Sequence, residues 1–206
     1  MVAVLADFYR RAEGGGEITQ FGTAEAVAVN VLENFEQTQS FIGQGALGQK
    51  QFDSIRSYAQ KFLGNEALFQ QRIDGGYIRD CHGDLYSANI CLADKVYIYD
   101  CIEFNQRFRY CDVASDVAFL AMDLEYYGLD SLAGRFIEQF VANPALMAKS
   151  TTRLLSTGKA PGSPMQVGHV WLFGSPPNSV LLPQKILLFV RRCACTSRPI
   201  TPSYVP

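Results

Sequence analysis

The chain has 206 residues, of which 48% are apolar, so it is long enough and apolar enough to bury a core. Its formal net charge of -2 is too small to favour binding to nucleic acid or to an anionic membrane surface. No apolar run approaches the roughly 18–20 residues of a membrane span, and charged residues interrupt the N-terminus where a signal peptide would need an apolar stretch. We therefore expect a cytoplasmic protein.

Helical periodicity dominates the first third of the chain. Residues 2–12 place their apolar side chains on one face, as a helix requires. Thr23 is a typical helix cap, and it predicts a second helix that runs towards Phe41. A third helix is expected over about residues 50–73, and Gly64 lies at a point where that helix can be divided. Asp74-Gly75-Gly76 is a strong stop signal.

The pattern changes between residues 77 and 104, where short β-branched and aromatic segments alternate with polar turns. Residues 89–92 and 96–100 predict two strands of a hairpin, joined by residues 93–95. Helical periodicity returns at about 112–127 and again at 130–142. These elements predict an α+β fold that is mostly helical and carries a short β-hairpin.

The residues that can carry chemistry are concentrated around this hairpin. His82, Asp84 and Asn89 form the pattern H-x-D-x-x-x-x-N, and Asp100 ends the strand that follows. Phosphoryl transfer needs a carboxylate that orients the acceptor hydroxyl, and Mg²⁺ favours carboxylate and amide oxygens. Asp84 is therefore the candidate catalytic base. Asn89 and Asp100 are the candidate ligands of Mg²⁺ and, through it, of ATP.

The same residues allow a structural interpretation. Asp84 can be an ordinary turn residue, and Asn89 can be an amide at the edge of a strand. His82 has two possible roles, as a catalytic group that transfers protons or as a side chain that holds the backbone of the loop. The pattern favours the second role for His82.

Three segments carry a family resemblance: HGDLYSANI, IYDCIEFN and YCDVASDVAFLAMDL. They resemble the aminoglycoside phosphotransferase family, which is also called choline/aminoglycoside kinase-like. The upstream segments FGTAEAVAVNVLENFEQT and LFQQRIDGGYIRDCHGDL resemble its bacterial branch, in which this domain is fused to a P-loop ATP-binding domain. The resemblance covers residues 1–147 and implies the C-terminal lobe of a protein-kinase-like fold.

The resemblance also implies roles for individual residues. Asp84 corresponds to the catalytic Asp, and Asn89 and Asp100 correspond to metal ligands. Asp112 and Asp116 match a D-x-x-x-D element that opens a helix under the catalytic loop. Asp116 is then expected to hold this loop by hydrogen bonds, although a solvated helix carboxylate would fit the same position.

The implied function is transfer of the γ-phosphoryl group of ATP, with Mg²⁺, to a hydroxyl of a small molecule. A protein kinase is less favoured, because no A-P-E segment follows Asp100. The family commonly has His-Pro or His-Leu where this chain has Tyr86-Ser87. We expect the N-terminal nucleotide lobe and the P-loop domain to be absent, since no G-x-x-x-x-G-K-[ST] occurs. A second hypothesis is therefore a catalytically silent fragment or an interaction module.

Charge and proline content change sharply near the end of the resemblance. All 20 acidic residues precede residue 143, and all nine prolines follow residue 142. Residues 1–150 carry a balance of -8, whereas residues 151–206 carry six basic residues and no acidic one. We expect residues 148–206 to be an irregular, Pro-rich tail that arose from a frameshifted or misjoined reading frame.

Overall fold

The computed structural model describes residues 1–43 and 47–143. The expected tail over residues 148–206, including its proposed frameshift origin, lies outside the described residues. The described part is α+β, as expected, with helices predominating over a few short antiparallel strands. Its elements are α1 (Val2–Arg11), η1 (Gly16–Gly22), α2 (Ala24–Gln39), α3 (Gln49–Leu63), α4 (Glu66–Asp74), β1 (Ile78–Asp80), η2 (Ser87–Asn89), β2 (Ile90–Leu92), β3 (Val96–Ile98), α5 (Gln106–Arg109), β4 (Tyr110–Asp112), α6 (Val113–Tyr126) and α7 (Asp130–Val141).

Local signals in the sequence set the ends of several helices. The hydroxyl of Thr23 accepts a hydrogen bond from the Ala26 amide at 3.2 Å, so Thr23 caps α2 as expected. The third predicted helix is divided at Gly64, which ends α3 two residues before α4 begins. Both expected helices after the hairpin, α6 and α7, are present within a few residues of their predicted bounds.

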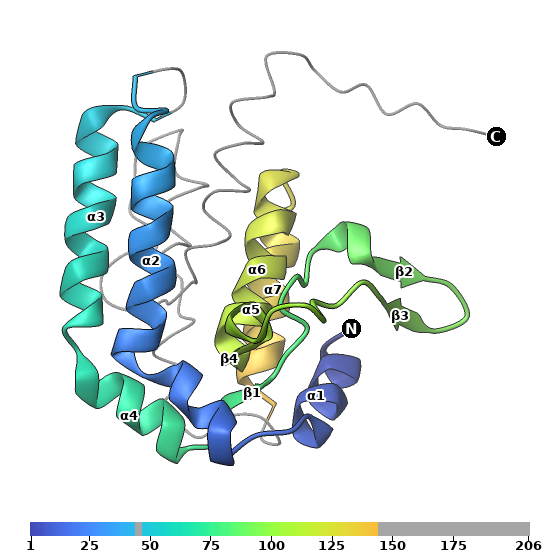
Figure 1. The fold of residues 1–206 in the computed structure, drawn as a ribbon. Helices are drawn as coiled ribbons and strands as arrows, with labels where there is room; N and C mark the ends of the chain where they lie inside the picture. Colours follow the sequence, from blue (N-terminus) through green and yellow to red (C-terminus); the bar gives the residue numbers. More distant parts are fainter. Residues whose placement is uncertain (44–46, 144–206) are drawn as a thin grey trace.

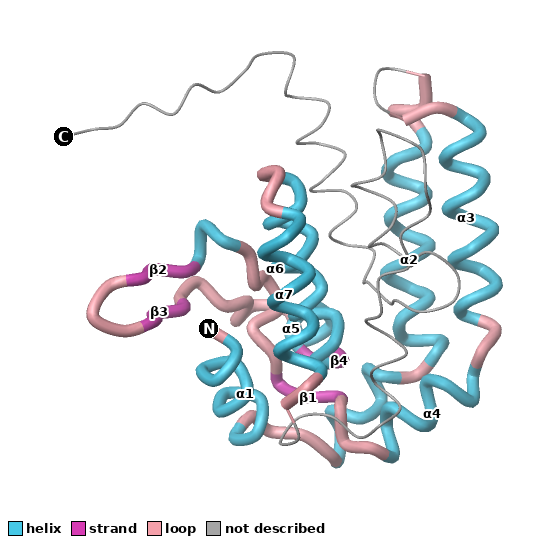
Figure 2. The backbone as a smooth tube through the Cα atoms, turned by 180° about the vertical axis from the view of Figure 1, so that it is seen from behind, coloured by secondary structure: helices cyan, strands magenta, loops and turns pink. Residues whose placement is uncertain are grey.

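Four of the longer helices form two pairs that stand side by side (Figures 1 and 2). In one pair α2 packs against α3, and in the other α6 packs against α7. The segment made of η1 and α4 joins the pairs at one end, and α1 packs on α7. The β2–β3 hairpin projects from the α6–α7 side (Figure 1).

Each of the two sheets in the described part of the chain contains two antiparallel strands. In the expected hairpin, Ile90 pairs with Ile98 and Leu92 with Val96, and both strands are shorter than predicted. The second sheet pairs Ile78 of β1 with Asp112 of β4. The sequence did not predict this second sheet, because three-residue strands are too short to show a hydrophobic period.

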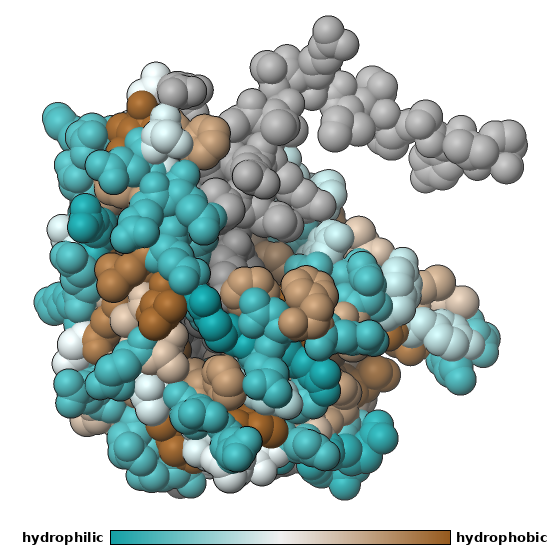
Figure 3. Space-filling model, viewed as in Figure 1, coloured by the Kyte–Doolittle hydropathy of each residue, from teal (hydrophilic) through white to brown (hydrophobic). Residues whose placement is uncertain are grey.

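Helix α6 lies at the centre of the main core. Its residues from Val113 to Asp123 are all buried, and it packs against Leu85, Phe140 and Tyr9 from other elements. Helices α2 and α3 bury a smaller cluster of their own around Val31, Phe35, Phe52 and Ala59. On the face shown in Figure 3, polar side chains cover most of α2, α3 and α4, with apolar side chains in smaller patches between them.

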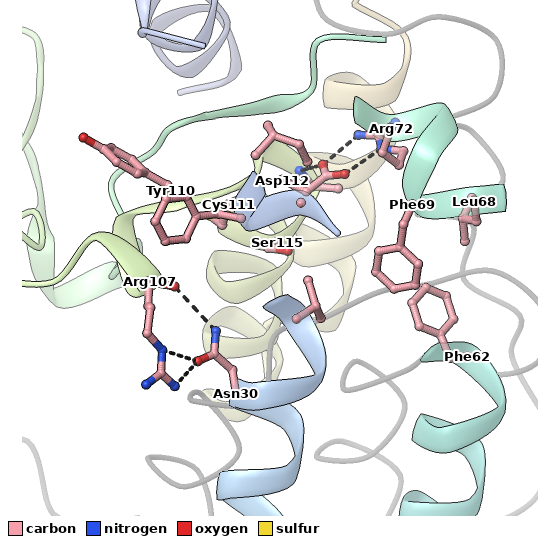
Figure 4. A pocket seen from close by; sticks show the side chains of 15 residues that line it. Asn30, Phe62, Leu68, Phe69, Arg72, Arg107, Tyr110, Cys111, Asp112 and Ser115 are labelled. Atoms are coloured by element: carbon pink, nitrogen blue, oxygen red, sulfur yellow. Dashed lines mark hydrogen bonds and ion pairs between the residues drawn. The ribbon is translucent and has the colours of Figure 1, made fainter. Parts of the chain in front are cut away.

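A buried ion pair connects α4 to the start of α6. The Arg72 guanidinium donates two hydrogen bonds to the Asp112 carboxylate, at 2.6 and 2.7 Å, and lies 3.7 Å from the centre of the Tyr77 ring (Figure 4). Asp112 also accepts from the Ala114 amide at 2.8 Å, so the same carboxylate caps α6. Asp112 thus supports the start of α6 directly as its cap, and Arg72 holds the Asp112 carboxylate in place.

None of the described helices combines the length and the apolar character that a membrane span requires.

We predict that Arg72→Met lowers the free energy of unfolding by about 3 kcal/mol, because it leaves the partly buried Asp112 carboxylate without its cation. Asp112→Asn retains the helix cap and removes the negative charge. In urea unfolding, the double variant Arg72→Met/Asp112→Asn should therefore lose clearly less than the sum of the two single losses. Strictly additive losses would show that the two side chains are not coupled.

A second prediction concerns Glu125, in the last turn of α6. Burial, and to a lesser extent the nearby Asp130 carboxylate, raise its pKa from the ordinary value of 4.5 to about 8. The folded state then binds this proton more tightly than the unfolded state, so the contribution to stability is lost as pH rises from about 4.5 to about 8. Glu125→Gln should remove this loss and be more stable than the parent chain at pH 8 by about 1 kcal/mol, since partial exposure screens the burial penalty.

Thermal unfolding at several pH values tests this expectation. The Glu125→Gln curve should stay above the parent curve at pH 8 and approach it near pH 5. Glu138→Gln on α7 is the control, because that side chain is exposed and should leave the pH profile of the parent unchanged. Parallel curves for Glu125→Gln and the parent chain across this range would contradict the assignment.

Candidate functional site

The loop that carries the candidate residues is tied to α6 by Asp116. This carboxylate is fully buried and accepts hydrogen bonds from the His82 amide at 2.9 Å and the Gly83 amide at 3.0 Å. It is not a solvated helix carboxylate. Two charge-assisted bonds to consecutive amides fix the direction in which the chain leaves β1 and enters the loop.

A third donor to Asp116 comes from the far end of the sequence. The Tyr9 hydroxyl on α1 donates to the same carboxylate at 3.0 Å. Burial, followed by the negative charge of Asp116, raises the pKa of Tyr9 well above its ordinary value, so the phenol stays protonated and can donate. Sequence reasoning missed Tyr9, because its position on the apolar face of the first helix indicates only a core residue.

The His82 ring holds the loop against the end of the hairpin. Its Nδ1 accepts from the Asp84 amide at 3.3 Å, and its Nε2 lies 2.9 Å from the Tyr99 carbonyl oxygen. A carbonyl can only accept, so Nε2 is the donor in this contact, and Nδ1 is the acceptor of the Asp84 amide. Both ring nitrogens therefore contact backbone groups in a side chain that is only 5% exposed. This geometry fits the loop-holding role, and the catalytic role of His82 stays a prediction.

Asn89 is buried at the end of the η2 turn. Its side-chain amide nitrogen donates to the Asp84 carbonyl at 3.1 Å, and its backbone carbonyl accepts from the Tyr99 amide at 3.1 Å. The first bond directs Nδ2 towards the loop and therefore directs the carbonyl oxygen Oδ1 away from it. Asn89 thus links Asp84 to the second strand of the hairpin, and its side chain carries the kind of oxygen that a hard cation prefers.

Asp100 occupies a strained position two residues beyond β3. Its φ of 63° lies in the left-handed region, where no other described residue except glycine is found. The neighbouring backbone holds it there, because Tyr99 contacts the His82 ring and the Ile102 amide donates to the His82 carbonyl at 2.9 Å. Such a conformation costs on the order of 1 kcal/mol for a non-glycine residue, and strained residues of this kind gather at functional sites.

Close packing fixes the rest of the loop. Gly83 has a φ of 79°, and a side chain there would bring its Cβ within 2.8 Å of the Phe108 carbonyl oxygen. Leu85 is fully buried in the main core, directly after the half-buried Asp84. The loop is therefore held on both sides of Asp84.

A second carboxylate of α6 binds the far end of the loop. The Asp123 side chain accepts from the Ser87 amide at 2.8 Å and from the Ser87 hydroxyl, and it is only 4% exposed. This contact was not expected from the sequence. Its signal was the spacing of seven residues between Asp116 and Asp123, which places both carboxylates on the same face of a helix.

The candidate residues thus fall into two groups. Asp84, Asn89 and Asp100 belong to one loop-and-hairpin unit, joined through the hydrogen bonds of His82 and Tyr99. Asp116 lies beneath this unit and contacts it directly. Asp112 does not contact this unit in the hydrogen bonds described above; it caps the N-terminus of α6 and pairs with Arg72.

Two of the candidate residues carry side-chain oxygens that could bind magnesium. Asn89 offers an amide oxygen and Asp100 a carboxylate, and both are hard ligands. Within residues 1–43 and 47–143, no cluster of three or more His, Cys, Asp or Glu side chains could hold a metal ion by itself. A magnesium ion at this place would therefore take its other ligands from phosphate oxygens and water, as is usual for this ion.

The cavity in Figure 4 is a separate feature. It has a volume of about 40 Å³ and lies among η1, α2, α4 and β4. Its polar lining includes Asn30, whose side chain is held by Arg107, and of the candidate residues only Asp112 borders it. The cavity is therefore no part of the loop-and-hairpin unit.

The chain is similar to part of several longer mycobacterial proteins. Uncharacterized proteins of Mycobacterium bovis (Mb2027c) and Mycobacterium tuberculosis (MT2060 and Rv2004c) are each 34% identical to it over 152 residues. The matched region is 73% of this chain and 30% of each relative, so the chain spans less than a third of the length of these curated relatives. No protein-family model and no solved structure matches the chain.

The strain at Asp100 gives a testable order of stabilities. Asp100→Asn should unfold within about 0.5 kcal/mol of the parent chain, because Asn tolerates the left-handed region. Asp100→Gly should be at least as stable, whereas Asp100→Ala should be less stable by about 1 kcal/mol. Glu103→Ala, an exposed loop substitution, is the control and should change little in the same urea titration. If Ala at position 100 were as stable as Gly, the backbone there would not be strained.

Proposed function

We propose that this chain supplies the catalytic loop and the metal ligands of an ATP- and Mg²⁺-dependent phosphotransferase with a protein-kinase-like lobe. The acceptor in this proposal is a hydroxyl group of a small molecule. The observation that carries the proposal is the loop-and-hairpin unit, in which Asp84 and Asn89 are linked directly and Asp100 is held beside them through His82. Phosphoryl transfer depends mainly on positioning and on charge neutralisation, and this unit provides fixed groups for both.

Each residue has a distinct task in this proposal. Asp84 orients the acceptor hydroxyl and accepts its proton as the new phosphate ester bond forms. Asn89 and Asp100 hold the metal, which neutralises the charge of the nucleotide phosphates when it is bound. Asp116 and His82 act on the backbone and keep these groups at fixed places.

The arrangement of elements gives further support. A helical segment precedes the loop, the hairpin follows it, and α6 lies beneath it with a buried carboxylate on the loop amides. This order is the one expected for a kinase-like C-terminal lobe.

One observation favours the alternative of a catalytically silent fragment or an interaction module. Large apolar side chains are exposed on and after the hairpin, with Leu92 at 74% and Phe104 at 85%. Exposed apolar side chains can take part in protein contact surfaces. A contact module would use this surface and would need neither Mg²⁺ nor ATP.

Calorimetry with Mg-ATP distinguishes the two functions. We expect the 206-residue chain to bind Mg-ATP with a Kd between about 1 μM and 1 mM, the range usual for enzyme substrates. Asp100→Asn should weaken binding at least about tenfold, and the exposed Glu103→Gln serves as the matched control. Asp84→Asn should leave binding nearly unchanged while it lowers phosphoryl transfer by about 10²–10⁴-fold in any preparation that is active. Absence of Mg-ATP binding would support the silent-fragment alternative instead.

A further inference from the structure

Two carboxylates on one face of α6 hold the two ends of the candidate catalytic loop. Asp116 accepts from the amides of His82 and Gly83, and Asp123 accepts from the amide and the hydroxyl of Ser87. The two acids are seven residues apart, which is two helical turns or about 10 Å along the axis. Asp84 lies between the two attachment points.

The two attachments differ in what they control. Asp116 fixes the start of the loop, directly before Asp84. Asp123 fixes Ser87, the first residue of the η2 turn, and Asn89 is the last residue of that turn. The backbone N–H of Asn89 donates to the Tyr86 carbonyl at 3.0 Å, so the Asn89 backbone moves with this turn if the turn rotates. The orientation of the Asn89 side chain therefore depends on the bond between Ser87 and Asp123.

We propose that Ser87 and Asp123 are positioning residues for the metal ligand Asn89, an inference that rests on the phosphotransferase function proposed above. The carboxylate receives two hydrogen bonds from one residue in an almost fully buried place, and this double contact defines both the position and the rotation of Ser87. Neither residue touches the metal or the substrate in this proposal. Their effect reaches the site through the turn.

This role has a specific consequence for metal affinity. Partners that orient a metal ligand typically change metal affinity by about 10–100-fold when they are removed. Ser87→Ala deletes one of the two bonds and leaves the amide bond in place, so we expect the Mg²⁺ concentration that half-saturates ATP binding to rise by about tenfold. Ser87→Thr retains a hydroxyl and should restore most of the affinity. Asp123→Ala removes the acceptor of both Ser87 hydrogen bonds and should raise this Mg²⁺ concentration at least as much as Ser87→Ala.

Calorimetric titration of the full 206-residue chain with ATP, at a series of Mg²⁺ concentrations, tests the proposal. The temperature is kept well below the unfolding transition of every variant, so that a purely structural loss of stability does not alter the measured Kd. Ser57→Ala on α3 is the matched control, since that serine is exposed and far along the chain from the loop. Hydrogen exchange of the Ser87 and Asn89 amides provides a second measurement. We expect it to accelerate in Ser87→Ala and Asp123→Ala but not in Ser57→Ala.

The possible results separate this inference from the function on which it rests. If the parent chain binds Mg-ATP and Ser87→Ala or Asp123→Ala binds it with the same Mg²⁺ dependence, the positioning role is wrong and the phosphotransferase proposal stands. If the parent chain shows no Mg-ATP binding, both proposals are overturned, whatever the exchange rates of the variants. A tenfold rise in Ser87→Ala that Ser87→Thr reverses supports the positioning role.

Discussion

The buried carboxylate of Asp116 is the interaction on which the rest of the site depends. A fully buried charge is costly unless hydrogen bonds replace its lost water, and here three donors do so: two consecutive loop amides and the Tyr9 hydroxyl. All three donors lie outside α6, the helix that carries this acid. The requirement to satisfy this one carboxylate therefore brings α1, the loop after β1 and α6 together.

Two further carboxylates, Asp112 and Asp123, also hold neighbouring segments to α6 by hydrogen bonds. Arg72 and Asp112 fix the start of α6, and Asp123 lies two turns further on, under the end of the loop. Helix α6 thus acts as a rigid support with an acid at three levels. The loop above it needs little structure of its own, and β2, β3 and η2 contain only three residues each. Rigid support under a short loop is what a positioning mechanism requires.

The balance between strain and support gives the proposed function its physical basis. Asp100 has an unfavourable backbone conformation, and His82 holds the residues on either side of it through its ring and its carbonyl oxygen. Energy spent on this strained position is offset by the packing of α6 and by the hydrogen bonds of the loop. A contact module would have no evident need for a strained acid, whereas a metal ligand must be aimed. For this reason we favour the proposed phosphotransferase over the alternative of an interaction module that uses the exposed apolar surface of the hairpin.

The sequence by itself determined the local features of this protein. Helical periodicity located α1, α2, α6 and α7, and Thr23 set the start of α2. Gly64 divided α3 from α4, and short β-branched and aromatic segments between polar turns located the hairpin. Each of these signals acts over a few residues. It also singled out Asp84, Asn89 and Asp100 as candidate residues through their spacing. Only the tertiary structure decided how the loop is held: the bonds from Tyr9 to Asp116, from Ser87 to Asp123 and from Arg72 to Asp112 join residues between 36 and 107 positions apart. Local periodicity carries no information about such pairs, since a buried tyrosine or a helix acid has the same pattern whatever its distant partner is.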